Sequence, residues 1–274
     1  MSEPSSQPPS SPAPSSPAPP SQPAPDRPHA STDSVDLLVA AQWGALRGWL
    51  QGISPAQRQQ TSVLFGWSVD DVISHLARTL DAIAALRPAP AGTGAGTDPG
   101  AEAETVAAQD EPARPTLTVP QFLSGYSAGA DDNAERTRAA AAASAADRLG
   151  ELDAAWGQAQ RTLAALGQYD PTVTVTGGTM RLTDFLQTRL IELVVHAGDL
   201  HRSLPEVAAP PLLPAAVERV EQTLRQGFEA KAGVLGADTE LRRLPADEFI
   251  LVATGRAEAP ERIPAAVRGE LPLW

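Results

Sequence analysis

The stretch LTDFLQTRLIELVVHAGDLHRSL, residues 182–204, decides the fold of this chain. Its large apolar residues recur at three- and four-residue spacing, which is typical of a helix with one face in a protein core. At about 100° per residue, a polar stripe spanning roughly 80° borders that apolar face. We predict a helix over 184–204, capped by Thr183 or Asp184 and ended by Pro205. Its polar stripe consists of Arg189, Glu192, His196 and Asp199.

Apolar residues at helical spacing predict further helices, over residues 34–53, 69–86, 118–143, 147–166 and 213–232. Ser68 and Asp71 form a capping box at the start of the second of these helices. Ser144 and Asp147 repeat the pattern before the fourth. The fold class is therefore predicted as mainly α, a helical bundle with a small α/β C-terminal appendage.

The segment before the polar-striped helix is predicted as a β-hairpin, because residues alternate on both sides of Gly177-Gly178. Two other stretches contain too few large apolar groups to offset the entropy lost on folding. We expect both, the Pro/Ser-rich tail and the Pro/Gly/Ala-rich insertion, to be disordered. The predicted organisation is thus a tail over 1–34, a bundle over 35–204 with the insertion at 88–116, and a short C-terminal appendage over 205–274.

Composition excludes several classes of function. The 274-residue chain contains no cysteine, so it has no disulfide, no zinc finger and no protein thiol that could act as a nucleophile. A net charge of −12 argues against a nucleic-acid surface, because binding to phosphates requires a basic patch. No apolar run approaches the roughly 18 residues of a membrane span. The start, MSEPSSQPPSS, lacks the basic and apolar regions of a secretory signal. We therefore expect a cytoplasmic protein that binds neither nucleic acid nor membrane.

The polar stripe contains two residues at the spacing of metal ligands. Glu192 and His196 lie four residues apart, which places both side chains on one face of a helix. A third ligand must come from another helix, and the chain has only four histidines. His29 lies in the tail, and His201 is about 140° around the helix from His196, which leaves His75. Two histidines and one glutamate with an open position form the ligand set of catalytic zinc and also of non-haem iron.

The same stripe can be explained without a metal. Buried Glu, His and Asp side chains are costly unless they are paired. Arg189 and Glu192 are three residues apart and can form an ion pair, while His196 hydrogen-bonds to Asp199 at the same spacing. Spacing alone leaves both interpretations open.

Two long segments resemble one known superfamily. SVLFGWSVDDVISHL, residues 62–76, resembles the GWT-x-x-D-x-x-x-HL start of the second helix in the DinB-like, mycothiol-dependent maleylpyruvate isomerase superfamily. The stretch 182–204 is similar to the fourth bundle helix of that superfamily, with its R-x-x-E-x-x-x-H-x-x-D pattern. Residues 115–139 and the tail from DEFILVATGR to LPLW resemble an actinobacterial branch with a sterol-carrier-like C-terminal part. The region after the bundle is shorter here than in full-length relatives.

The resemblance implies a DinB-like four-helix bundle that binds a divalent metal, usually zinc, in its interior. Its metal ligands map onto His75, Glu192 and His196. The cofactors implied are this metal and mycothiol, a small thiol held as its thiolate. A metal lowers the pKa of a thiol, and a protein without cysteine must take its sulfur from another molecule.

The resemblance also implies roles for three further residues. Asp199 would accept the free ring N–H of a histidine ligand. Arg189 would hold Glu192 or a substrate carboxylate. Arg256 is the nearest counterpart of an arginine that the family isomerases bring to the metal from their C-terminal part.

Two functions from different classes follow. The first is a metal-dependent, mycothiol-using isomerase or S-transferase that acts on small electrophiles. The alternative is a non-catalytic, sterol-carrier-like protein that binds a small molecule, with a structural metal or none. A fourth protein ligand that saturates the metal would favour the alternative, and Asp199 is the candidate for that role.

Overall fold

The computed structural model describes residues 34–91, 113–128, 130–144, 147–167, 169–233 and 239–273. Most of the two segments predicted to be disordered lies outside these residues. The described residues from Ser34 onward form one compact unit, and the predicted boundary between bundle and appendage falls inside it. Among the described residues, no helix combines the length and the apolar character needed to cross a membrane.

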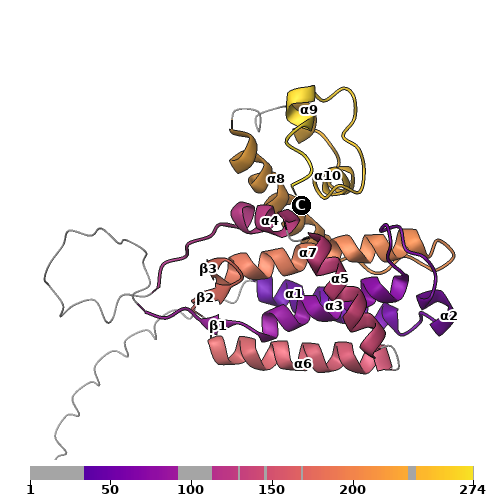
Figure 1. The fold of residues 1–274 in the computed structure, drawn as a ribbon. Helices are drawn as coiled ribbons and strands as arrows, with labels where there is room; N and C mark the ends of the chain where they lie inside the picture. The colour runs from indigo at the N-terminus through magenta and orange to yellow at the C-terminus, as the bar shows by residue number, and fades with distance from the viewer. Residues whose placement is uncertain are drawn as a thin grey trace, which may run out of the picture. The chain divides into compact units, whose positions relative to one another are not determined.

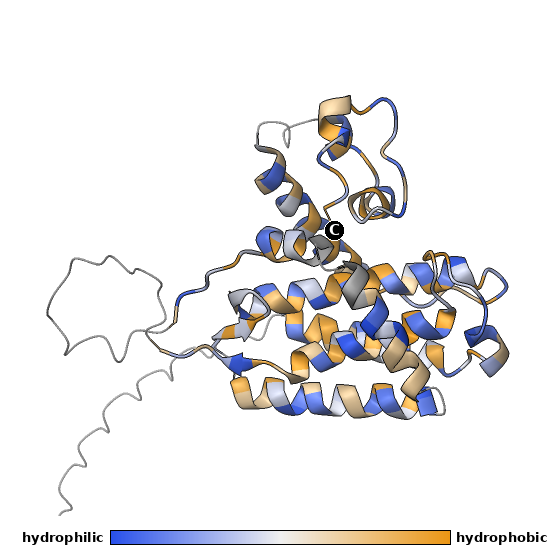
Figure 2. Cartoon of the chain, viewed as in Figure 1, coloured by the Kyte–Doolittle hydropathy of each residue, from blue (hydrophilic) through white to orange (hydrophobic). Residues whose placement is uncertain are grey.

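Four helices form the bundle (Figure 1): α1 (Val35–Leu50), α3 (Val69–Ala84), α6 (Arg148–Leu166) and α7 (Leu182–Ser203). Helix α3 packs against α6 and α7, and α1 packs against α7. The Trp43 ring of α1 meets the Trp156 ring of α6, with centroids 6.4 Å apart. The short helix α2 (Pro55–Arg58) lies in the connection from α1 to α3. Figure 2 shows long stretches of hydrophobic residues on the central helices, as the predicted apolar faces require.

Helix α3 begins where its capping box was predicted. Asp71 accepts a hydrogen bond from the backbone N–H of Ser68 at 2.8 Å, and Ser68 Oγ accepts one from the backbone N–H of Asp71 at 3.1 Å. The second predicted box is wrong, because Ser144 is the last residue of helix α5 (Ala130–Ser144). Asp147 alone is the N-cap of α6, where it accepts from the N–H of Gly150.

Helix α7 begins two residues earlier than predicted. Its N-cap is Arg181, which makes no side-chain capping bond, because the chain passes directly from a strand into the helix. A residue outside the helix provides the capping hydrogen bond: Asp170 Oδ1 accepts from the N–H of Thr183 at 2.8 Å. Neither Thr183 nor Asp184 is the cap, and this correction leaves the polar stripe in place.

The predicted helix over 118–143 consists of two helices, α4 (Val119–Ala128) and α5. Helix α4 packs against α7, and α5 packs against α3. The two helices therefore cover the same helix pair, α3 and α7, on which the candidate ligands lie.

The predicted hairpin is confirmed, and it belongs to a sheet of three strands. Strand β2 (Thr172–Val175) pairs antiparallel with β3 (Gly178–Arg181), with Val173 opposite Met180. Gly177 has φ +87° in the turn, a conformation that favours glycine. The third strand, β1 (Arg87–Pro88), pairs with the outer side of β2. Pro88 is tolerated there because β1 is an edge strand.

Strand β1 corrects the boundaries of the predicted insertion. Ala89 donates its N–H to the carbonyl of Thr172, and Thr116 donates to the carbonyl of Thr179. Both ends of the segment 88–116 are therefore held against the hairpin by backbone hydrogen bonds. Its composition gave no sign of this, since strand pairing at an edge requires few large side chains.

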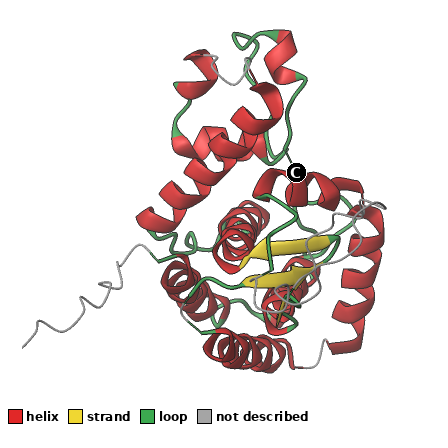
Figure 3. Ribbon diagram, turned by 90° about the vertical axis from the view of Figure 1, so that its left-hand side faces the viewer, coloured by secondary structure: helices red, strands yellow, loops and turns green. Residues whose placement is uncertain are grey.

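Helices are the regular structure that is described in the C-terminal part, and loops join them: α8 (Pro214–Ala232), α9 (Thr239–Arg242), α10 (Ala246–Ala253) and α11 (Ala265–Arg268). The mainly α fold class with a small β component is confirmed, but the strands lie within the bundle segment (Figure 3). Helix α8 packs against both α7 and α10. Arg225 of α8 lies over the Phe249 ring of α10, 4.0 Å from its centroid.

Candidate metal site

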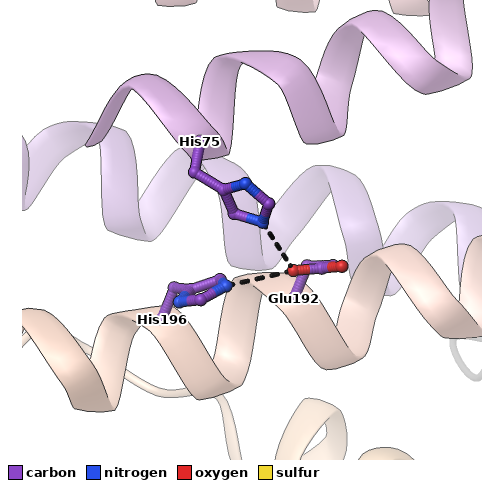
Figure 4. Close-up of side chains that lie close together, drawn as sticks. All are labelled: His75, Glu192 and His196. Carbon is purple, nitrogen blue, oxygen red and sulfur yellow. Dashed lines mark hydrogen bonds and ion pairs between the residues drawn. The ribbon is translucent and has the colours of Figure 1, made fainter. Parts of the chain in front are cut away.

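Three buried side chains from two helices converge inside the bundle (Figure 4). His75 comes from α3, and Glu192 and His196 come from successive turns of α7. One carboxylate oxygen, Glu192 Oε2, lies 3.1 Å from His75 Nε2 and 3.1 Å from His196 Nε2. All three potential ligand atoms lie within 4.8 Å of one another. The side chains predicted from spacing therefore share one site.

The spacing of these atoms is compatible with a metal ion. Ligands about 2.0–2.2 Å from a tetrahedral zinc are about 3.3 Å from each other. The observed separations of 3.1 Å are close to that value. The donor set, two imidazole nitrogens and one carboxylate oxygen, suits zinc and iron(II) alike.

The proton on His196 gives a second test of the fit. Its Nδ1 donates to Asp199 Oδ2 at 2.9 Å. In a neutral imidazole the other nitrogen then has no proton. His196 Nε2 and Glu192 Oε2 would be two acceptors 3.1 Å apart, an arrangement that requires a cation between them. That cation is either a second proton on His196 or a metal ion.

The pKa shifts without a metal follow from burial and these contacts. Burial opposes ionisation of Glu192, but hydrogen bonds from His196 and His75 hold the pKa of Glu192 well below its usual range. Burial also disfavours a charged His196, yet hydrogen bonds to Asp199 and Glu192 raise the pKa of His196. Burial lowers the pKa of His75. Without a metal, the site thus favours the charged forms of Glu192 and His196 and the neutral form of His75.

His75 makes two ring contacts in addition to its contact with Glu192. Its ring packs edge-on against Trp67, with centroids 5.6 Å apart, and against His196 at 4.7 Å. Its Nδ1 is buried and has no hydrogen-bond partner among the described residues. The sequence analysis gave Trp67 no part in the site, although it stands in the segment 62–76 that carries the family resemblance.

Asp199 is the centre of a second cluster of buried charge. Its side chain is fully buried and accepts hydrogen bonds from Arg202 at 2.6 Å and from Arg256 at 3.1 Å, in addition to His196. Burial opposes its ionisation, but the hydrogen bonds and charges of His196 and Arg256 lower the pKa of Asp199 to about 2. Arg202 was missed in the sequence, although its three-residue spacing from Asp199 could have indicated it.

Arg189 lies on the other side of Glu192. Its guanidinium is 3.9 Å from Glu192 Oε1, and its Cζ lies 4.9 Å from the centroid of the Phe185 ring. The two contacts of the metal-free interpretation, Arg189 with Glu192 and His196 with Asp199, are thus both present. That interpretation requires a protonated His196 where a metal would otherwise bind.

A cavity of about 440 Å³ adjoins the site, and His75 and Arg189 form part of its wall. Arg256 is not in that wall and contacts Asp199 instead. His201 does not belong to the ligand cluster found among the described residues. The structure thus joins the six residues predicted for the site in a chain of contacts. His75, His196 and Arg189 each contact Glu192, Asp199 contacts His196, and Arg256 contacts Asp199.

The sequence profile of the mycothiol maleylpyruvate isomerase N-terminal domain matches residues 39–201, more than half of the chain. This chain belongs to that family. The match to the mycothiol maleylpyruvate isomerase family includes the three candidate ligands and Asp199, and ends before α8. The sterol-carrier-like character predicted for the C-terminal part therefore finds no support in this match. No curated protein and no solved structure matched the chain in comparison.

Proposed function

We propose that this protein is a divalent-metal-dependent enzyme that uses mycothiol to act on small electrophiles, as an isomerase or an S-transferase. The convergence of His75, Glu192 and His196 on one buried point carries the proposal. Membership of a mycothiol-associated family supports the choice of thiol. Zinc is the metal we propose, since its usual ligands match this set.

The metal would supply one piece of chemistry, the lowering of the pKa of a coordinated thiol so that the thiolate predominates near neutral pH. The chain itself has no cysteine to offer. Three protein ligands leave a tetrahedral metal one position for an external molecule, which is the arrangement of catalytic rather than structural zinc.

The protein residues around the site orient and protect it. Asp199 accepts the Nδ1 proton of His196 at 2.9 Å, which turns Nε2 toward Glu192 and keeps it free of a proton when a metal is bound. Arg202 and Arg256 hold the Asp199 carboxylate in place. We therefore propose Arg256 as a positioning residue, which acts on His196 through Asp199, and not as a substrate contact.

Arg189 is proposed to neutralise Glu192 and to form the wall of the substrate cavity. Its guanidinium lies between the Glu192 carboxylate, 3.9 Å away, and the Phe185 ring. A cation in this position limits the negative charge that Glu192 brings to the site. The side chain of Arg189 is 3 % exposed and lines the cavity.

The non-catalytic alternative would be favoured by Asp199 as a fourth metal ligand, but the contacts of Asp199 argue against that role. Asp199 bonds to His196 Nδ1, the nitrogen that does not face Glu192, and is engaged by two arginines. It is therefore a poor fourth ligand for a metal between His75 and Glu192. We keep this alternative only as an outcome of the following experiment.

Cobalt substitution tests the proposal. Adding mycothiol to the Co²⁺-loaded protein should produce a sulfur-to-cobalt charge-transfer absorption, because the thiolate would enter the open position. The oxygen analogue of mycothiol, with a hydroxyl in place of the thiol, is the matched control and should produce none. An unchanged spectrum at millimolar mycothiol would contradict thiol chemistry at this site and leave the binding-protein alternative.

A further inference from the structure

The cavity beside the candidate metal site has one of the three candidate ligands, His75, in its wall, together with Arg189. His75 lies 3.1 Å and Arg189 3.9 Å from the Glu192 carboxylate, and both line the cavity. Its volume of about 440 Å³ is in the range of small-molecule sites. A molecule in this cavity would therefore lie next to the position where a metal-bound thiol is proposed.

The charge of the cavity wall is opposite to that of the protein. Three arginines line it, Arg78 from α3, Arg136 from α5 and Arg189 from α7, and no aspartate or glutamate does. The whole chain carries a net charge of −12. Positive charges around one cavity repel each other, and low-dielectric walls concentrate their field. A bound anion would relieve this repulsion.

Two of these arginines have no carboxylate partner. Arg189 is close to Glu192, but neither Arg78 nor Arg136 forms an ion pair with any described residue. The charge of Arg78 acts to lower the pKa of Asp81 on the same helix, but the two residues form no ion pair. Among the described residues, positive charge therefore remains at the cavity after the ion pairs are counted.

The wall also contains unsatisfied polar groups. The Nε of Arg78 and the hydroxyl of Thr79 are buried without a hydrogen-bond partner in the described parts of the chain, and Thr79 is 2 % exposed. A buried polar group without a partner destabilises the protein, because it has lost its hydrogen bonds to water. A slight adjustment of these side chains around a ligand with acceptor oxygens would relieve this destabilisation.

We infer that this cavity binds the organic electrophile through a carboxylate, and that Arg78 and Arg136 select for this negative charge. Guanidinium groups match the geometry of carboxylate and phosphate oxygens. Phe122 and Leu117 share the wall, so the ligand also has an apolar body, which an inorganic anion lacks. The inference rests on the proposed function only in naming the bound anion as the electrophile.

The negative charge of the ligand would be recognised by arginines of the bundle and not by an arginine of the C-terminal part. Arg256 is engaged with Asp199 and lies outside the cavity wall, whereas Arg78 and Arg136 belong to α3 and α5. The C-terminal part would then be dispensable for anion binding but not for the position of His196.

Calorimetric titration of the full-length protein with phenylacetate and phenylacetamide tests the inference, because these probes share a shape and differ in charge. Each is measured with the zinc-loaded protein and after removal of metal by a chelator. We expect phenylacetate to bind more tightly in both forms. Arg78→Gln should lower the affinity for phenylacetate by about 10-fold or more. This corresponds to the loss of a hydrogen bond to a charged group, which contributes roughly 1.5–3 kcal/mol. Arg136→Gln should have a smaller effect, since its side chain is exposed.

Arg138→Gln is the matched control, an exposed arginine two positions along α5 that does not line the cavity, and it should bind like the wild type. Retained binding of phenylacetamide shows that each variant is folded.

Equal affinity for the two probes, or no loss of phenylacetate affinity in Arg78→Gln, would overturn the inference. Inorganic phosphate bound as tightly, with the same dependence on Arg78, would replace the carboxylate by a phosphate group. Binding of phenylacetate only to the zinc-loaded protein would assign the anion to the metal and leave the proposed function standing. If the protein takes up no metal but still binds phenylacetate more tightly than phenylacetamide, the inferred anion site stands and the proposed function is contradicted.

Discussion

Replacement of Asp199 by asparagine tests how the metal site is supported. The substitution preserves the shape of the side chain and removes its charge. Asparagine has one acceptor oxygen, whereas Asp199 accepts hydrogen bonds from His196, Arg202 and Arg256 with two. The amide nitrogen would face a guanidinium, so at least one of the three donors loses its partner.

The magnitude follows from the pKa of Asp199. An unfolded aspartate has a pKa of about 3.9, and the folded value is about 2. The difference corresponds to about 2–3 kcal/mol of folding free energy at neutral pH in the metal-free protein. Because the folded pKa is depressed, this stabilisation is present above about pH 4 and is lost as the pH falls toward 2. The gap between wild type and Asp199→Asn should therefore narrow by about 1 kcal/mol at pH 3.

Two assays measure these effects. Urea unfolding of the metal-free proteins at pH 7 and pH 3 gives the stability gap at each pH. Competition with a chromophoric chelator gives the zinc affinity, which should fall by about 10–100-fold in Asp199→Asn. Asp153→Asn is a matched control, since Asp153 pairs with Arg47 on the surface and should leave zinc affinity unchanged. Unchanged zinc affinity in Asp199→Asn, or a stability gap that is the same at both pH values, would refute the reasoning.

Three further outcomes are expected. Arg256→Gln should lower zinc affinity by less than Asp199→Asn, because Arg202 still holds the carboxylate, and an effect equal to loss of a ligand would contradict a positioning role. Zinc binding should release about one proton per metal below the raised pKa of His196, and proton release measured in weak buffer should decline as the pH rises through it. Leu190→Ala should destabilise the protein by about 2–5 kcal/mol in urea, because the exposed fraction of this side chain is 0 % and the bundle would be left with a cavity.

The helices and the candidate ligands could be predicted from the sequence because both depend on periodicity. Helical spacing placed Glu192 and His196 on one face of α7, and the scarcity of histidines pointed to His75. Residues that act across helices gave no such signal. Arg78 and Arg136 line one cavity only because α5 packs on α3. The spacing of residues within either helix does not predict this packing.

The errors in the fold have a common physical origin. The cap of α7 was predicted at Thr183 or Asp184 from the local pattern, but Asp170, thirteen residues before Thr183, accepts the hydrogen bond at the start of this helix. Strand β1 likewise forms because the hairpin offers an edge to a segment whose own composition is that of a loop. The start of α7 and the formation of β1 both depend on residues that are distant in the sequence, so a local sequence pattern cannot predict them.

The metal content of the purified protein tests the central claim most directly. Elemental analysis of the wild type, His196→Ala and His201→Ala should find about one equivalent of divalent metal in the first and third and none in the second. His201 is a suitable control because it lies on α7 outside the ligand cluster. Absence of metal from the wild type even after zinc is added back would contradict the claim and assign the stripe to a buried ion-pair network. Equal loss in both variants would contradict the ligand assignment itself.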